Sequence, residues 1–242
     1  MVSNLYFRTV LKTTKLEIFQ KKLLKQLLSL PQNAPDSAIY LLTGFLPVEA
    51  QIHKKELQLF NNITNQSEES IEKRLARRQL AIKLNLSASR FIEIKKLLLK
   101  YELQDPIFML DNPNTKNEWK SNLNRKINVY WWNNIKHSTT LYKSLQFLNN
   151  EKCYPGKIHP LLSINCKSSR DVNRIPTKLK LLTGTYILQN NRAKYKNYTI
   201  DPTCLLCDSE AETPAHFILN CPALSSIRNP IIAELQMLKK IF

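Results

Sequence analysis

Four residues near the carboxyl end have the types and the spacing of a metal site. The segment from Asp201 to Cys221 reads DPTCLLCDSEAETPAHFILNC, in which two residues separate Cys204 from Cys207. His216 follows after eight further residues, and Cys221 follows after four more. Three thiolate sulfurs and one imidazole nitrogen are ligands that a closed, tetrahedral structural zinc site uses. We therefore expect these side chains to bind Zn2+.

Local signals place two of these ligands on a short helix. Thr213 and Pro214 are typical of an N-cap and of a first helical residue, so a helix that carries His216 is expected to begin here. Pro222 is expected to end this helix directly after Cys221, because proline lacks the backbone donor that a further turn requires. The other two ligands lie on a Cys-x-x-Cys turn, which presents two sulfurs to one ion.

Other interpretations of the cysteines fit less well. A thioredoxin-like redox motif requires a βαβ setting, which the flanking sequence lacks. A disulfide framework requires an oxidising compartment, whereas the five cysteines are an odd number and no signal peptide precedes them. We therefore expect an intracellular, reducing compartment. Chance clustering of core cysteines stays open, and Cys153 and Cys166 are expected to be ordinary thiols.

The composition favours a mainly α fold with a polyanionic partner. The chain has 242 residues, enough to bury a sizeable core, and only three glycines for hairpin turns or phosphate-binding loops. No apolar run approaches the roughly 20 residues of a transmembrane helix, so no membrane partner is expected. The 36 lysines and arginines against 19 aspartates and glutamates give a net charge of +17, which favours RNA or DNA.

Helical periodicity dominates the first part of the chain. Leu16, Phe19, Leu23 and Leu27 recur on one face of a helix expected over residues 15–28. Prolines delimit further helices predicted over 36–42 and from 47, and serine caps at 67 and 87 predict helices over 68–84 and 88–101. A Thr-x-x-Glu capping box at 115 predicts a helix to about 135, and another helix is expected to begin at 138.

These patterns divide the chain into three parts. Residues 1–148 are expected to form a helical, thumb-like or connector scaffold. Residues 149–175 contain several prolines and little periodicity, which predicts a linker. Residues 176–242 are expected to contain a basic helix followed by a small zinc-braced module with its Cys-x-x-Cys turn and short helix.

The densest positive charge lies just before the cysteines. Eight basic residues and one acid, Asp171, occur between positions 167 and 197. A helix is expected over about 177–189, with Leu179, Leu182, Tyr186 and Ile187 as its buried stripe. Cations that neutralise phosphates, next to rings that stack on bases, are typical of single-strand binding. The residues expected to bind nucleic acid are Arg174, Lys178, Lys180, Arg192, Lys194, Tyr195 and Lys196.

A solvated helix end whose tyrosines pack inward is the alternative interpretation of this basic stretch. The segment 201–221 itself carries four acids and no lysine or arginine. If nucleic acid binds this half of the chain, we expect the basic helix to contact it and the zinc module to act as a brace.

The carboxyl-terminal pattern resembles the end of non-LTR (LINE-type) retrotransposon reverse transcriptase polyproteins. The C-x2-C-x8-H-x4-C segment and its lead-in, KLKLLTGTYILQNNRAKYKNYTIDPTCLLC, carry the resemblance. Upstream, FQKKLLKQLLSLP and AIYLLTGFLPVEAQIHKKELQLF are similar to the thumb-like region beyond that family's polymerase palm, so the resemblance covers nearly the whole chain. It implies the same four metal ligands and a tail that engages template RNA and target DNA. The rest of such a polyprotein is a further implied partner.

No polymerase activity is expected from the chain on its own. Reverse transcriptases hold two metal ions with a paired-aspartate motif and a third aspartate, and no two aspartates are adjacent here. Asp36, Asp105 and Asp111 lie beside prolines or helix ends, where capping is the better interpretation. Because Met1 directly precedes the thumb-like segment, we expect the tail of such a polyprotein, as a degenerate copy or a separate reading frame.

Three functions therefore stay open. The first is a zinc-braced, nucleic-acid-binding tail of such a reverse transcriptase. The second is a zinc-stabilised protein-interaction module, in which an acidic zinc face and exposed Leu205 and Leu206 meet a protein partner. The third is a catalytic fragment that works only with a palm domain supplied in trans.

Overall fold

The computed structural model describes residues 2–239 and confirms a mainly α fold. In chain order the helices are α1 (Val2–Leu27), α2 (Asp36–Thr43), α3 (Val48–Thr64), α4 (Ile71–Ile82), α5 (Arg90–Lys100), α6 (Pro106–Asp111), α7 (Lys116–Thr140), α8 (Ser169–Leu182), α9 (Gln189–Tyr195) and α10 (Ser225–Lys239). Short helical turns are η1 (Lys143–Leu145), η2 (Asn150–Lys152), η3 (Pro160–Leu162), the π-helical η4 (His216–Asn220) and η5 (Pro222–Leu224). Within these residues no helix is both long and apolar enough to cross a membrane.

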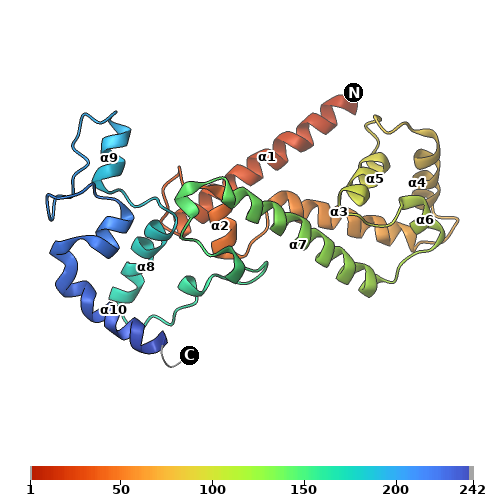
Figure 1. The fold of residues 1–242 in the computed structure, drawn as a ribbon. Coiled ribbons are helices and arrows are strands. Elements are labelled where there is room, and N and C mark those ends of the chain that lie inside the picture. The colour runs from red at the N-terminus through yellow and green to blue at the C-terminus, as the bar shows by residue number, and fades with distance from the viewer. Residues whose placement is uncertain (1, 240–242) are drawn as a thin grey trace.

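Helices α3 and α7 pack along each other and form the long axis of the molecule (Figure 1). Helices α4, α5 and α6 lie between them in the sequence and close one end, while α1 and α2 pack at the other end. Trp119, Leu123 and Ile127 recur every four residues on α7 and are at most 2% exposed, because this stripe faces the core. One continuous core results, from Leu24 in α1 to Leu179 in α8.

Helix α1 carries the predicted apolar face but turns it to solvent. Leu16, Phe19 and Leu27 are 51%, 63% and 71% exposed. The opposite face packs instead: Leu24 lies in the core, and the Glu17 carboxylate accepts a 2.9 Å hydrogen bond from the Val48 backbone N–H at the start of α3. The first N–H groups of a helix have no partner within it, so this contact from α1 caps α3. Periodicity predicted the stripe correctly but not what it faces.

Several predicted helix starts are confirmed or nearly so. Helix α2 begins at Asp36, α3 follows Pro47, and the Thr115 hydroxyl accepts from the backbone N–H of Glu118 at the start of α7. The cap of α4 is Ser70, three residues after the predicted serine, and its hydroxyl accepts from the Lys73 backbone N–H.

The prediction that a new helix starts at Ser138 is wrong, because α7 continues through that residue to Thr140. The Ser138 hydroxyl donates to the Asn134 carbonyl at 2.9 Å, a bond that satisfies serine inside a helix. A serine near a helix end therefore indicates either a cap or such a back-bond.

The predicted linker is packed onto α2. It contains η2, η3 and the start of α8, and the Gly156 N–H donates to the Gly44 carbonyl at 2.8 Å. The His159 N–H donates to the Leu42 carbonyl at 2.9 Å. Gly44 has φ +70°, and a Cβ there would lie 2.3 Å from the Lys157 carbonyl oxygen, so this close approach requires glycine. The division into domains stays a prediction.

Helix α8 begins earlier than predicted, at Ser169 in place of about Thr177. A capping box starts it: the Ser168 hydroxyl accepts from the Asp171 N–H, and the Asp171 carboxylate accepts from the Ser168 N–H. Pro176 lies inside the helix, so the break expected from the prolines is absent there. The helix therefore gains eight residues at its start, among them both of its arginines, Arg170 and Arg174.

The predicted carboxyl end of the same helix is also wrong. Gly184 has φ +63°, and a Cβ there would lie 2.6 Å from the Ser144 carbonyl oxygen, so α8 ends at Leu182 with glycine in the left-handed conformation. Leu179 is buried as predicted, whereas Ile187 lies beyond the helix and is 60% exposed. The signal that predicts this end is the glycine itself. Residues 240–242 of the predicted zinc module lie outside the described residues.

Candidate metal centre

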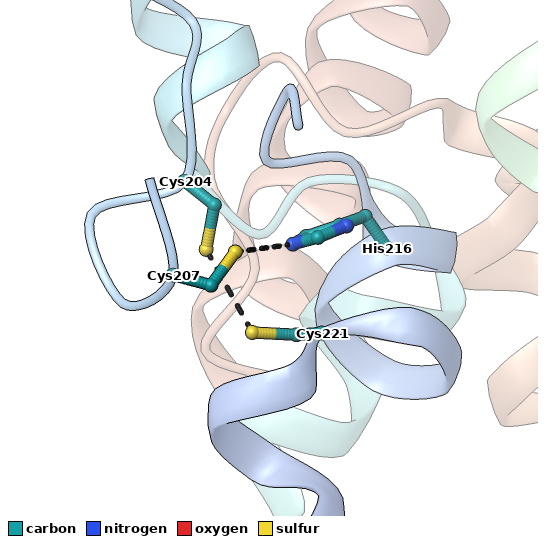
Figure 2. Close-up of side chains that lie close together, drawn as sticks. All are labelled: Cys204, Cys207, His216 and Cys221. Carbon is teal, nitrogen blue, oxygen red and sulfur yellow. Dashed lines mark hydrogen bonds between the residues drawn. The ribbon is translucent and has the colours of Figure 1, made fainter. Parts of the chain in front are cut away.

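The predicted ligands come together in the carboxyl-terminal module (Figure 2). The Sγ atoms of Cys204, Cys207 and Cys221 and a ring nitrogen of His216 all lie within 4.8 Å of one another. Cys204 Sγ lies 4.0 Å from Cys221 Sγ, and Cys207 Sγ lies 3.3 Å from His216 Nε2. Metal–sulfur bonds of about 2.3 Å and metal–nitrogen bonds of about 2.0 Å at tetrahedral angles give separations of roughly 3.8 Å and 3.5 Å. The group can therefore hold a metal ion.

A short backbone loop forms the Cys-x-x-Cys turn. The Cys204 N–H donates to the Glu210 carbonyl at 2.8 Å, and Thr203 and Ala211 form an antiparallel bridge. The Asp208 N–H donates back to the Cys204 carbonyl at 2.9 Å. Asp208 has φ +49°, a left-handed conformation that aspartate tolerates better than most residues. These bonds hold both sulfurs on one side of the turn.

The second pair of ligands lies on the predicted short helix. The Thr213 hydroxyl accepts from the His216 N–H at 3.1 Å, which confirms the N-cap. Beyond it the helix widens, and the Cys221 N–H donates to the His216 carbonyl at 2.7 Å, five residues back. In a regular α-helix, side chains five residues apart point about 140° away from each other. The π-type turn brings them to one side, which explains the spacing of four intervening residues.

Burial and hydrogen bonds give the thiols unequal acidity. Cys204 and Cys221 are fully buried, and burial raises the pKa of Cys204. A 3.0 Å hydrogen bond with the Ser209 hydroxyl, helped by His216, lowers the pKa of Cys207 to about 6. The thiolate is the form that binds metal, so Cys207 is ready to bind an ion at neutral pH.

Glu210 orients the histidine. Its Oε2 lies 3.0 Å from His216 Nδ1, which leaves Nε2 directed toward Cys207 and the other sulfurs. Burial opposes protonation of His216, but the contacts with Glu210 and Cys207 outweigh it and raise its pKa. Metal-binding histidines commonly donate their second ring nitrogen to a carboxylate in this way. Sequence reasoning missed this role, although the four acids of the segment were its natural candidates.

Two contacts tie the module to neighbouring helices. The Glu212 carboxylate accepts a 2.6 Å hydrogen bond from the Gln189 N–H, the first residue of α9. The Arg228 guanidinium, on α10, donates to the Cys221 carbonyl at 2.9 Å. Because Glu212 caps α9, the position of that basic helix depends on the module.

The predicted nucleic-acid-binding residues lie on α8, on α9 and directly after it. Lys180 is half-buried, and the exposed ones are Arg174, Lys178, Arg192, Lys194, Tyr195 and Lys196. Among the described residues, none of these cations forms an ion pair with a carboxylate. Tyr195 and Tyr198 are 66% and 63% exposed, so these rings do not pack inward as the alternative interpretation requires.

The remaining cysteines lie apart from the metal group. Cys153 is buried, and its carbonyl accepts a 3.1 Å hydrogen bond from the indole N–H of Trp132 on α7. Cys166 is partly exposed. Neither belongs to the group of side chains that can hold a metal.

Comparison with models of known families, with curated proteins and with solved structures finds no match to this chain. The residues and their geometry therefore carry the functional assignment.

Proposed function

We propose that this chain is a Zn2+-braced, nucleic-acid-binding tail of a non-LTR reverse transcriptase, without polymerase activity of its own. The observation that carries the proposal joins two features. Around α9 lie exposed tyrosines and exposed cations that have no acidic partner among the described residues, and Glu212, from the loop that carries the Cys3His group, caps that helix.

The donor set favours zinc over other ions. Three thiolates and an imidazole in a tetrahedral arrangement suit Zn2+, whereas Mg2+ and Ca2+ prefer oxygen ligands. Two of the cysteines are fully buried and the histidine is 3% exposed, so a closed, structural site fits better than one with an open catalytic position. Reduced cysteines in such a site fit an intracellular, reducing compartment.

The surface chemistry favours a nucleic acid. Cations without acidic partners remain free to neutralise phosphates, and exposed rings beside them can stack on bases. With the resemblance to reverse transcriptase tails, this supports template RNA or target DNA as ligand and the rest of such a polyprotein as partner. The absence of paired aspartates in the sequence supports a binding role without polymerisation.

The test is the salt dependence of single-stranded RNA binding, measured by fluorescence anisotropy. Each phosphate neutralised on a single strand contributes about −0.7 to the slope of log K against log salt. Replacing Arg192, Lys194 and Lys196 together by glutamine should make the slope shallower by about 2.

A matched control removes the same charge elsewhere. Arg74 and Arg78 on α4 and Lys83 directly after it are exposed, and within the described part of the chain they form no ion pair. Helix α4 lies at the opposite end of the molecule from α9 (Figure 1). Their replacement by glutamine should leave the slope close to that of the unchanged chain. Equal slopes for the two triple variants would refute the assignment of α9 as a contact surface.

A protein-interaction module is the second candidate. Leu205 and Leu206 lie between the two cysteines of the turn and are 67% and 51% exposed, beside the exposed acids Asp208 and Glu210. Salt-independent or absent RNA binding by a zinc-loaded chain would favour this candidate over the first.

A further inference from the structure

One face of α8 changes from basic to apolar along its length. Arg170, Arg174 and Lys178 recur every four residues and are exposed, and Leu181 follows three residues later on the same side. Within the described part of the chain these three cations have no acidic partner. The face is therefore a row of free positive charges that leads toward apolar side chains.

The basic half of this face is hollowed and polar. A shallow cleft of about 520 Å³ is lined by Ser169, Arg170, Asn173, Arg174, Thr177 and Lys178. Four residues of α-helix rise about 6 Å, which is comparable to the separation of consecutive phosphates along an unpaired strand. The hydroxyl and amide groups between the cations can donate hydrogen bonds to phosphate or sugar oxygens.

The apolar half leads into a groove against the metal module. This groove, of about 380 Å³, is bounded by Leu181 and Leu182 of α8, by Ile218 and Leu219 of η4, and by Phe147. The wall from η4 lies between the ligands His216 and Cys221, so its position depends on the metal site.

Lys178 lines both the cleft and the groove. A ligand that fills the groove with a flat, apolar group therefore places that group beside the Lys178 ammonium. The part of the same ligand that extends into the cleft then meets Arg170 and Arg174. A nucleotide has this combination, since its base is a planar ring system and its phosphate is an anion. An apolar peptide side chain satisfies the groove but leaves the row of cations unused.

We propose that a single strand lies along α8, with successive phosphates at Arg170, Arg174 and Lys178 and one unstacked base in the groove. This inference rests on the proposed function and deepens it by naming the ligand as unpaired nucleic acid. Phe147, which is 52% exposed, supplies an aromatic surface for the base. Because the groove is lined almost entirely by apolar side chains, base identity is read weakly and the site accepts many sequences.

The experiment compares two probes of equal length and charge on the zinc-loaded full chain. The probes are a fluorescent deoxyadenylate 12-mer and the same backbone with abasic sites throughout, measured by anisotropy at several salt concentrations. Loss of base stacking typically costs fivefold or more in affinity, so the abasic strand should bind at least about fivefold more weakly.

Two substitutions separate the halves of the site. Phe147→Leu keeps the groove apolar but removes the ring, and should reduce the advantage of the base-containing strand. Phe108→Leu is the matched control, because Phe108 is also 52% exposed and lies on α6 at the far end. Arg170→Gln should make the salt slope shallower by about 0.7 for both probes and preserve their affinity ratio.

The outcomes distinguish this inference from the proposed function. If both probes bind with the same salt-dependent affinity, or if Phe147→Leu matches its control, the base site is refuted while nucleic-acid binding stands. If neither probe binds with a salt-dependent affinity, and single-stranded RNA does not either, both proposals fail, and the groove then suits a protein partner.

Discussion

Loss of the Glu210 carboxylate should lower the zinc affinity of the site, because this side chain orients one of the candidate ligands. Glu210 contacts His216 Nδ1 at 3.0 Å and sets the direction of Nε2, the nitrogen that faces the sulfurs. Removal of such an outer carboxylate commonly lowers metal affinity by about 10- to 100-fold. The Glu210 side chain is 68% exposed, so water can replace part of its contact. We therefore expect Glu210→Ala to lower zinc affinity near the lower limit, about tenfold.

The assay is a competition titration with a chromogenic chelator of known zinc affinity under reducing conditions. Glu210→Gln should lose less than Glu210→Ala, because its amide oxygen can still accept from Nδ1–H. Asp208→Asn is the control: it removes one negative charge from the same loop, and its side chain has no hydrogen bond to a metal ligand in the described structure. If Glu210→Ala and Asp208→Asn bind zinc equally well, the orienting role of Glu210 is wrong.

Three further predictions follow from the fold. Chelation, or Cys221→Ser, should expose α9 and the module to hydrogen exchange while α1–α7 stay protected, because metal binding and local folding are coupled; uniform protection would contradict this. Gly44→Ala should destabilise the chain more than Gly156→Ala in urea denaturation. Both glycines have positive φ, which costs roughly 1 kcal/mol for alanine. Of the two, only Gly44 would also place a Cβ against backbone, 2.3 Å from the Lys157 carbonyl oxygen, so equal losses of stability would contradict this. Burial, together with Lys100, lowers the pKa of His53 to about 4, so the unfolded state, with a pKa near 6.5, binds more protons. The free energy of unfolding should then fall as the pH drops from about 6.5 to 4, by up to about 1.4 kcal/mol per pH unit, and His53→Gln should flatten this dependence; an unchanged pH profile would contradict the assignment.

A partly buried hydrogen-bond network also favours the neutral form of His53. The Trp131 indole N–H donates to the Tyr101 hydroxyl oxygen at 2.9 Å, so the Tyr101 O–H is free to donate to His53 Nδ1, 2.6 Å away. Nδ1 then acts as an acceptor, which requires the unprotonated ring. Protonation on acidification removes that acceptor, so the pH prediction rests on geometry and burial together.

The grouping of the four candidate ligands could be predicted from the sequence because its signals are local. The Cys-x-x-Cys spacing, the Thr213 cap and the Pro222 stop all act within a few residues of the ligands. The helix between His216 and Cys221 was predicted, but its widening to a π-type turn was not. The roles of Glu210 and Glu212 depend on how the loop returns past the ligands and past α9, which spacing alone does not specify.

The orientation of α1 and the extent of α8 illustrate a different limit. The periodicity of Leu16, Phe19 and Leu27 defines a face, but the side that packs is the one that makes long-range contacts, through Leu24 in the core and Glu17 at the start of α3. For α8, the local capping box at Ser168 overrides the break expected from Pro176. The exposure of the apolar face of α1 can thus be predicted only from tertiary contacts, whereas the start of α8 could be predicted from its local capping sequence.

The most direct test of the central claim is a titration of strand affinity against bound zinc. The chain is stripped with a chelator under reducing conditions, zinc is restored stepwise, and zinc content and affinity for a single-stranded RNA 12-mer are measured on each sample. We predict one zinc ion bound per chain, and strand affinity that rises with zinc and reaches its limit at that ratio. Affinity independent of zinc content, or a chain that takes up no zinc, would contradict a metal-braced nucleic-acid-binding module.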